Sequence, residues 1–152
     1  MTENKLHPRD VGFQLAVDVS YSDGWEPTVN YRSDELMRVP DIVYVALGVD
    51  DVCLRVGQTG GALTARWEGV LKDQIPAERN GRRSYREHEW AFRDKWRSEG
   101  GARRVQFWIK RAHKIKFDYL GTEFEASVRG AEEIYLDRYY QPTLSVALDG
   151  RR

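Results

Sequence analysis

The sequence predicts an α/β domain whose small central sheet has three mostly antiparallel strands flanked by helices. Three short apolar runs predict the strands, and amphipathic stretches between and after them predict the helices. The chain has 152 residues, of which 41% are hydrophobic and 32% charged, so its size and composition are those of one globular domain. Such a length can bury roughly 68–70% of the unfolded surface, which is enough for a substantial core.

Each strand is indicated by a run of apolar residues. Ile42–Leu47 and residues 52–56 are almost wholly apolar, which is typical of strands that are covered on both faces. The acidic link Val49-Asp50-Asp51 is short enough for a hairpin between these two strands. Residues 105–109 predict the third strand.

Two helices are expected between the second and third strands. The first covers residues 62–71, and the second is an amphipathic helix over residues 84–98. Ser84 is a suitable N-cap for the second helix, and Glu87, three residues later, completes a capping box.

The two ends of the chain differ in character. Residues 1–40 are polar and rich in turn-forming residues, with residues 12–17 and 28–31 as candidates for short strands, so we expect an N-terminal extension ahead of a domain that spans residues 41–152. We expect a long helix over residues 122–140, because Pro142 would stop it.

Charge is balanced over the whole chain but unevenly distributed. The 24 basic and 24 acidic residues cancel, which counts against a strongly basic nucleic-acid-binding protein. Residues 79–116, however, hold 13 basic and 4 acidic residues, a surplus of 9. A segregated basic patch can neutralise phosphates where net charge does not, although such residues can also simply solvate helices and a strand edge. The candidate DNA-binding residues are Arg82, Arg83, Arg86, Arg103, Arg104, Lys110 and Arg111.

Membrane and disulfide signals are weak or absent. No apolar run approaches the ~20 residues of a membrane-spanning helix, and the N-terminus lacks the apolar core of a signal peptide. Cys53 is the single cysteine, so no disulfide can form within the chain. We therefore expect a cytoplasmic protein with no membrane partner, and the sequence leaves a homodimer open.

The most specific pattern is carried by three residues on the first two strands and the following helix. Tyr44 lies in the first strand, Gly57 ends the second, and Arg66 follows a glycine-rich bend. This layout resembles the core of the GIY-YIG nuclease superfamily, of which the chain would be a divergent member. The first triplet, Ile42-Val43-Tyr44, lacks the family's glycine, and the second, Arg55-Val56-Gly57, has arginine where the family has tyrosine.

The end of the chain extends the resemblance. The family has a glutamate followed by large apolar residues, a proline and an asparagine. Here Glu132 precedes apolar residues and Pro142, Glu133 has a slightly better distance to Pro142, and Ser145 stands where asparagine is usual. The resemblance implies that Glu132, or else Glu133, binds one divalent cation. A single carboxylate with water and phosphate oxygens suits Mg²⁺, or Mn²⁺ in its place.

The resemblance implies a metal-dependent DNA endonuclease. Tyr44, Arg55, Arg66, His88 and Glu132 would be its catalytic residues, because arginine offers a planar fork to phosphate and histidine transfers protons near neutral pH. Each of these residues also has a structural interpretation: a core tyrosine, a surface arginine, a helix-surface histidine or a solvated glutamate. Two other functions stay open at this point, namely a catalytically inactive nucleic-acid-binding or protein-interaction module and a regulatory partner protein that uses exposed aromatic residues.

Overall fold

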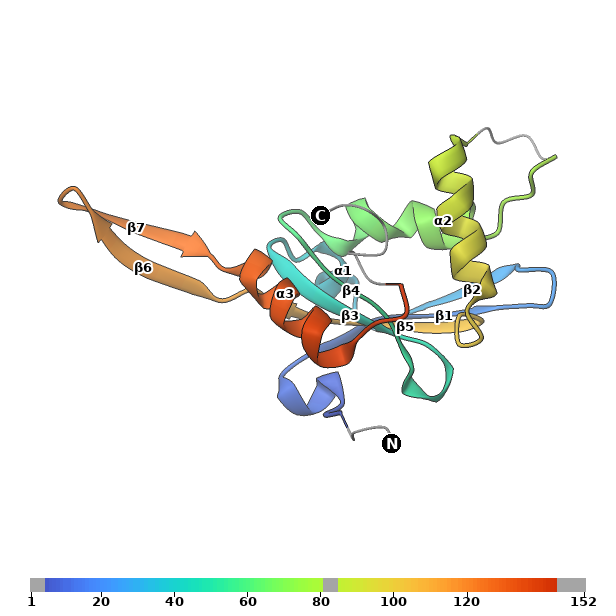
Figure 1. The fold of residues 1–152 in the computed structure, drawn as a ribbon, viewed down its shortest axis with the longest axis horizontal. Coiled ribbons are helices and arrows are strands. Elements are labelled where there is room, and N and C mark those ends of the chain that lie inside the picture. Colours follow the sequence, from blue (N-terminus) through green and yellow to red (C-terminus); the bar gives the residue numbers. More distant parts are fainter. Residues whose placement is uncertain (1–4, 81–84, 145–152) are drawn as a thin grey trace.

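The computed structural model describes residues 5–80 and 85–144. A five-stranded antiparallel sheet with the order β2-β1-β5-β3-β4 forms its centre, and a separate two-stranded hairpin, β6-β7, extends from one end (Figure 1). The strands are β1 (Gln14–Tyr21), β2 (Pro27–Tyr31), β3 (Ile42–Leu47), β4 (Cys53–Thr59), β5 (Arg104–Arg111), β6 (Lys114–Tyr119) and β7 (Thr122–Ser127). The α-helices are α1 (Asp34–Arg38), α2 (Glu87–Ser98) and α3 (Arg129–Tyr140).

The predicted fold class is confirmed, but the sheet has five strands where three were predicted. The two additional strands, β1 and β2, come from the first 40 residues, and β1 pairs along β5, with Val19 opposite Val105. The hairpin between β3 and β4 is present, and its link forms a short 3₁₀ turn at Val49–Asp51. Strands β1 and β2 thus share one sheet with β3 and β4, the strands that carry Tyr44 and Gly57.

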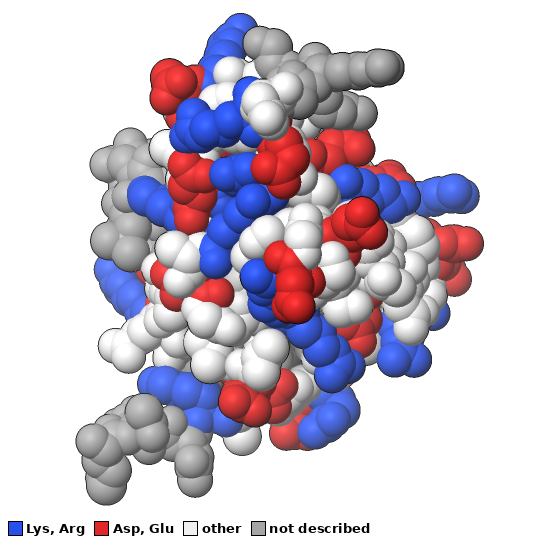
Figure 2. Space-filling view, turned by 90° about the vertical axis from the view of Figure 1, so that its right-hand side faces the viewer, with Lys and Arg blue, Asp and Glu red and all other residues white. Residues whose placement is uncertain are grey.

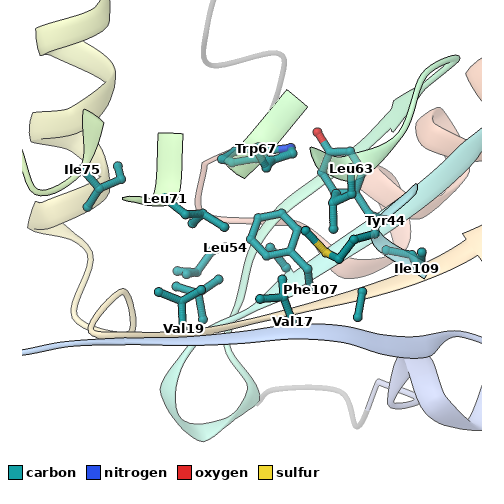
Figure 3. Close-up of a cluster of buried hydrophobic side chains, with 14 of the residues drawn as sticks. Val17, Val19, Tyr44, Leu54, Leu63, Trp67, Leu71, Ile75, Phe107 and Ile109 are labelled. Carbon is teal, nitrogen blue, oxygen red and sulfur yellow. The ribbon is translucent and has the colours of Figure 1, made fainter. Parts of the chain in front are cut away.

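Helical elements cover both faces of the sheet. On one face, α2 and the helical segment after β4 pack over a core that includes Tyr44, Trp67 and Phe107 (Figure 3). On the other face, α3 packs Leu136 and Tyr140 against a second cluster. All six residues of β3 are buried, as expected for a central strand that is covered on both faces.

The predicted helix over residues 122–140 is wrong in its first part. That part is strand β7, which pairs with β6, and α3 begins only at Arg129. Leu120 and Gly121 form the two-residue turn of the hairpin with φ values of 52° and 82°, the left-handed conformation that such tight hairpins need. As predicted, the helix ends just before Pro142.

The start of α2 also differs from its predicted position. The helix begins at Glu87, and the capping contact is made by Glu89, whose carboxylate accepts a hydrogen bond from the Arg86 amide at 3.1 Å. The predicted N-cap, Ser84, lies outside the described residues. None of the helices in residues 5–80 and 85–144 is long and apolar enough to cross a membrane.

Candidate active site

A widely wound helical segment follows β4 and carries Arg66. It consists of π-helical turns over Thr64–Glu68 and Val70–Gln74, and the Ile75 amide donates to the Val70 carbonyl at 2.9 Å. The buried apolar residues along it recur at a strict spacing of four, a step that overshoots a full α-helical turn by about 40°. A slightly wider winding reduces this drift and helps to keep these residues on one face. They are Leu63, Trp67, Leu71 and Ile75.

A pocket of about 530 Å³ lies between this segment and α2. Arg66 reaches it from the segment, while His88, Phe92 and Lys95 reach it from α2. Both Arg66 and His88 are exposed there, although 22 residues separate them in the sequence. Two permanent cations, one histidine and a single carboxylate, that of Glu89, line the pocket, so its charge favours an anion.

Arginines fix α2 against the end of the segment. The last carbonyls of a helical segment lack partners within it. Arg97 donates from Nε to the Ile75 carbonyl at 2.9 Å, and Arg93 donates to the Ala77 carbonyl. The side-chain amide of Gln74 donates to the Glu89 backbone carbonyl at 2.8 Å. These bonds hold the two walls of the pocket in register.

Tyr44 lies beneath the pocket wall. Only 1% of it is exposed, and its ring meets the Trp67 ring edge-on, with centroids 5.9 Å apart (Figure 3). Its hydroxyl end lies directly over the backbone of Gly57, the residue opposite it on β4. A β-carbon at Gly57 would be 2.3 Å from the Tyr44 hydroxyl oxygen. Glycine is therefore needed at position 57 for space.

Arg55 also lies behind the wall. It stands opposite Ala46 in the β3–β4 ladder, on the same side of the sheet as Tyr44, and 1% of it is exposed. Its Nη1 donates to the Leu144 carbonyl at 3.2 Å, and its guanidinium carbon lies 5.9 Å from the centre of the Phe92 ring. Arg55 is thus a buried guanidinium side chain behind the pocket.

Glu132 lies elsewhere. Its carboxylate accepts the backbone amide of His113 at 2.7 Å, and its second oxygen is 3.0 Å from the Nδ1 atom of that histidine. It lines a different pocket, together with Phe13 and Lys110. Phe13 belongs to the cluster on the α3 face of the sheet, opposite to the Tyr44 face. The structure therefore does not bring Glu132 into the Arg66–His88 pocket.

Glu133 has a different orientation because adjacent helical residues are turned by about 100°. It is one turn from Arg129 and one turn from Asp137, so the three residues share a helix face. Arg129 donates from Nε to the Gln58 side chain at 2.8 Å. Burial raises the pKa of the Cys53 thiol to about 12, and the nearby Asp137 carboxylate contributes to the increase. Leu136 and Tyr140, which pack against the sheet, follow Glu133 by three and seven residues, so Glu133 lies on the side of α3 that is turned toward the sheet.

A metal ion at Glu133 would take few ligands from the protein. Within residues 5–80 and 85–144, no group of three or more His, Cys, Asp or Glu residues could hold an ion. One carboxylate on the side of α3 toward the sheet fits Mg²⁺, which usually keeps several waters and binds one or two carboxylates plus phosphate oxygens.

Those predicted DNA-binding residues that the structure describes do not all lie together. Arg104 pairs with Asp18 at 2.9 Å at one end of β5, whereas Arg111 is exposed at the other end, about 24 Å away at the rise of an extended strand. Arg103 stacks on Trp25 beside Arg104, and Lys110 lies near Phe13. Figure 2 shows basic and acidic residues interspersed on the face that it presents. Arg82 and Arg83 lie outside the described residues, and Arg86 precedes α2.

Lys95 is a pocket residue that the sequence analysis missed. It follows His88 by seven residues, two helical turns, so both point to the same side of α2. That spacing was visible in the sequence once His88 was a candidate.

Comparison with known proteins shows the fold. No protein-family model and no curated protein matches the sequence. The structure is similar to a mutant of bacteriophage T4 EndoII, with a TM-score of 0.55 and 12% identity over 90% of this chain and 97% of that chain. It also matches the restriction endonuclease HPY188I in complex with product DNA, with a TM-score of 0.48 and 14% identity over 91% of this chain and 82% of that one. At that TM-score the second likeness carries no weight, and the first shows a shared fold.

Proposed function

We propose that this protein is a divalent-metal-dependent DNA endonuclease of GIY-YIG type. The observation that carries the proposal is the convergence of Arg66 and His88 on one pocket, with Tyr44 and Arg55 directly behind its aromatic wall. The fold shared with EndoII supports it, and in this chain the motif residues lie on β3, on β4 and on the helical segment after β4.

Arg66 and His88 would contact the scissile phosphate. The guanidinium group can donate two parallel hydrogen bonds to phosphate oxygens and stabilise the charge that builds on them. The imidazole group can hold or transfer a proton at the attacking or leaving oxygen. The Arg55 guanidinium group would add a positive potential from behind the Phe92 ring.

We assign the metal to Glu133 rather than Glu132. Both residues lie on α3, on the sheet face opposite Tyr44. Glu133 is on the side of the helix that Leu136 and Tyr140 turn toward the sheet, whereas Glu132 is directed at His113 beside the hairpin. A bound Mg²⁺ or Mn²⁺ ion would polarise the phosphate and relieve charge on the leaving oxygen.

The neighbouring glutamates form a matched pair of variants for this assignment. Glu133→Gln should abolish Mg²⁺-dependent nicking of supercoiled plasmid DNA while DNA binding persists, because the change removes a negative charge. Glu132→Gln should cut at the wild-type rate. Loss of cutting in Glu132→Gln alone would reverse the assignment.

Two alternative roles of Tyr44, catalysis by its hydroxyl group and packing by its ring, can be told apart by experiment. A catalytic phenol needs its hydroxyl group, whereas a ring that only packs against Trp67 does not. Tyr44→Phe should lower the cleavage rate at unchanged folding stability if the hydroxyl reacts, and should leave the rate unchanged if Tyr44 only positions Trp67 and its neighbour Arg66.

The burial of Tyr44 and Arg55 favours a second candidate, a catalytically inactive nucleic-acid-binding module. Plasmid cutting with Mg²⁺ or Mn²⁺, and its loss with a chelator, would select the enzyme. Salt-sensitive binding without cutting under every metal condition would select the module.

A further inference from the structure

The β6–β7 hairpin is an exposed arm with one apolar face. It extends away from the sheet (Figure 1), and all six residues of β6 are exposed. Phe117 and Phe124 stack across the two strands with ring centroids 5.8 Å apart. Tyr119 is 62% exposed, and Leu120 at the tip is 89% exposed.

The two faces of the arm differ sharply. Because side chains alternate along a strand, one face carries only apolar residues and Thr122. The other face carries two lysines and three carboxylates, which makes it unsuited to nucleic acid. The apolar face consists of Ile115, Phe117, Tyr119, Thr122, Phe124 and Ala126.

The arm would be unfavourable in a monomer, because it is a lone hairpin with an exposed apolar face. A lone two-stranded hairpin is marginally stable in water at best. Aromatic side chains bury about 150–250 Å² each, so three that are half exposed leave roughly 300 Å² of apolar surface. With Ile115 and Leu120 the arm carries a patch of the size that marks interaction sites.

The same chain carries an apolar pocket at the base of the arm. It has a volume of about 380 Å³ and is lined mainly by residues of α3 and the N-terminal segment, including Leu6, Phe13 and Leu136. Glu132, which lines this pocket, binds His113 immediately before β6. Tyr135, another lining residue, is 67% exposed.

We propose that two copies of this chain form a dimer by exchanging these arms. In an antiparallel pair the tip of each arm reaches the base of the other, which places Leu120 at the partner's pocket. Six residues of extended strand span about 20 Å, enough for the two apolar faces to cover each other. One chain supplies both surfaces, as a closed two-fold interface requires.

The expected size and charge of the interface agree with a dimer. The aromatic side chains of the arm supply roughly 300 Å² of the ~800 Å² that each partner buries in a standard interface, and Ile115, Leu120 and the pocket rim add to it. The zero net charge of the chain leaves no global repulsion to oppose association.

Sedimentation equilibrium of the whole protein tests the proposal. Phe117→Thr with Phe124→Thr removes the apolar pair, whereas the control, Asp118→Thr with Glu123→Thr, changes the adjacent cross-strand pair on the polar face. We expect a wild-type dimer, an unchanged control, and a dissociation constant at least about 30-fold higher for the apolar-face variant, the scale of losing a hot spot. A monomeric wild type, or equal dissociation constants for the two variants, would overturn it.

Disulfide trapping tests the position of the tip. In a Cys53→Ser background, Leu120→Cys with Tyr135→Cys should give a covalent dimer upon mild oxidation, because tip and pocket meet only between copies. Leu120→Cys with Val49→Cys, an exposed apolar residue outside the pocket, is the control. Equal covalent dimer in both variants would refute the assigned position.

Discussion

Gly57 is the position at which the packing of Tyr44 leaves no room for a side chain. The β-carbon of Gly57→Ala would lie 2.3 Å from the Tyr44 hydroxyl oxygen and 2.4 Å from Cζ, whereas ordinary contacts are 3.4–4 Å. The ring cannot retreat easily, because Trp67 and Phe107 pack against it at centroid distances of 5.9 and 5.8 Å. An overlap above 1 Å against a fixed ring should cost about 3 kcal/mol, the upper end of typical overpacking.

Urea denaturation of Gly57→Ala measures this cost as a lower midpoint at unchanged slope. Tyr44→Phe should not relieve it, because the ring carbon at 2.4 Å remains, whereas Tyr44→Leu should recover part of it in a double-mutant cycle. Gly69→Ala is the control, since nothing lies within 4 Å of its β-carbon, and in this helical position it should stabilise by about 0.5–1 kcal/mol. A loss below about 0.5 kcal/mol for Gly57→Ala, within the range of surface substitutions, would refute the steric argument.

Three further predictions concern Asp41, Cys53 and Arg97, side chains outside the pocket lining. Hydrogen bonds from Ser127 and Arg129 lower the pKa of Asp41, so its contribution to stability is present above the unfolded pKa of about 3.9 and disappears as the pH falls through the folded value. The stability difference between wild type and Asp41→Asn should therefore be largest near neutral pH and shrink below about pH 4, and a constant difference would contradict this. Burial raises the pKa of Cys53 to about 12, so a thiol reagent at pH 8 should modify the unfolded chain far faster than the folded one. Arg97→Ala should destabilise the fold by about 1–3 kcal/mol by leaving the Ile75 carbonyl unpaired, and an unchanged urea midpoint would show that water replaces the guanidinium group.

The central strands could be predicted from the sequence because their apolar runs are continuous. β3 is buried along its whole length, and no other local structure explains six consecutive apolar residues as well. The β6–β7 hairpin was missed because Thr122–Ser127 contains Glu and Ala, which favour helices. Its residues are also mostly exposed, so the segment lacks the apolar run that marks a buried strand. Its signals were the period-two alternation and the Leu120-Gly121 turn.

The site could be predicted only in part. Arg66 and His88, which the motif and the helix position singled out, line one pocket, and their roles at a phosphate stay predictions. The sequence could not separate Glu132 from Glu133, because the choice depends on how α3 is rotated against β4. A basic surplus in the sequence also does not say how the charges are spread in space: β5 carries Arg104 and Arg111 at its opposite ends, and the part of this segment in DNA binding stays a prediction.

The cleavage rate of a duplex under single-turnover conditions with Mg²⁺ tests the central proposal most directly. Arg66→Ala should lower the rate by a factor on the order of 10²–10³, the scale of losing one preorganised donor at the phosphate. Arg138→Ala, which changes an exposed helix arginine outside the pocket, should cut at the wild-type rate. Equal rates for Arg66→Ala and wild type, or no cutting by wild type with Mg²⁺ or Mn²⁺, would contradict the assignment of this pocket as a nuclease active site.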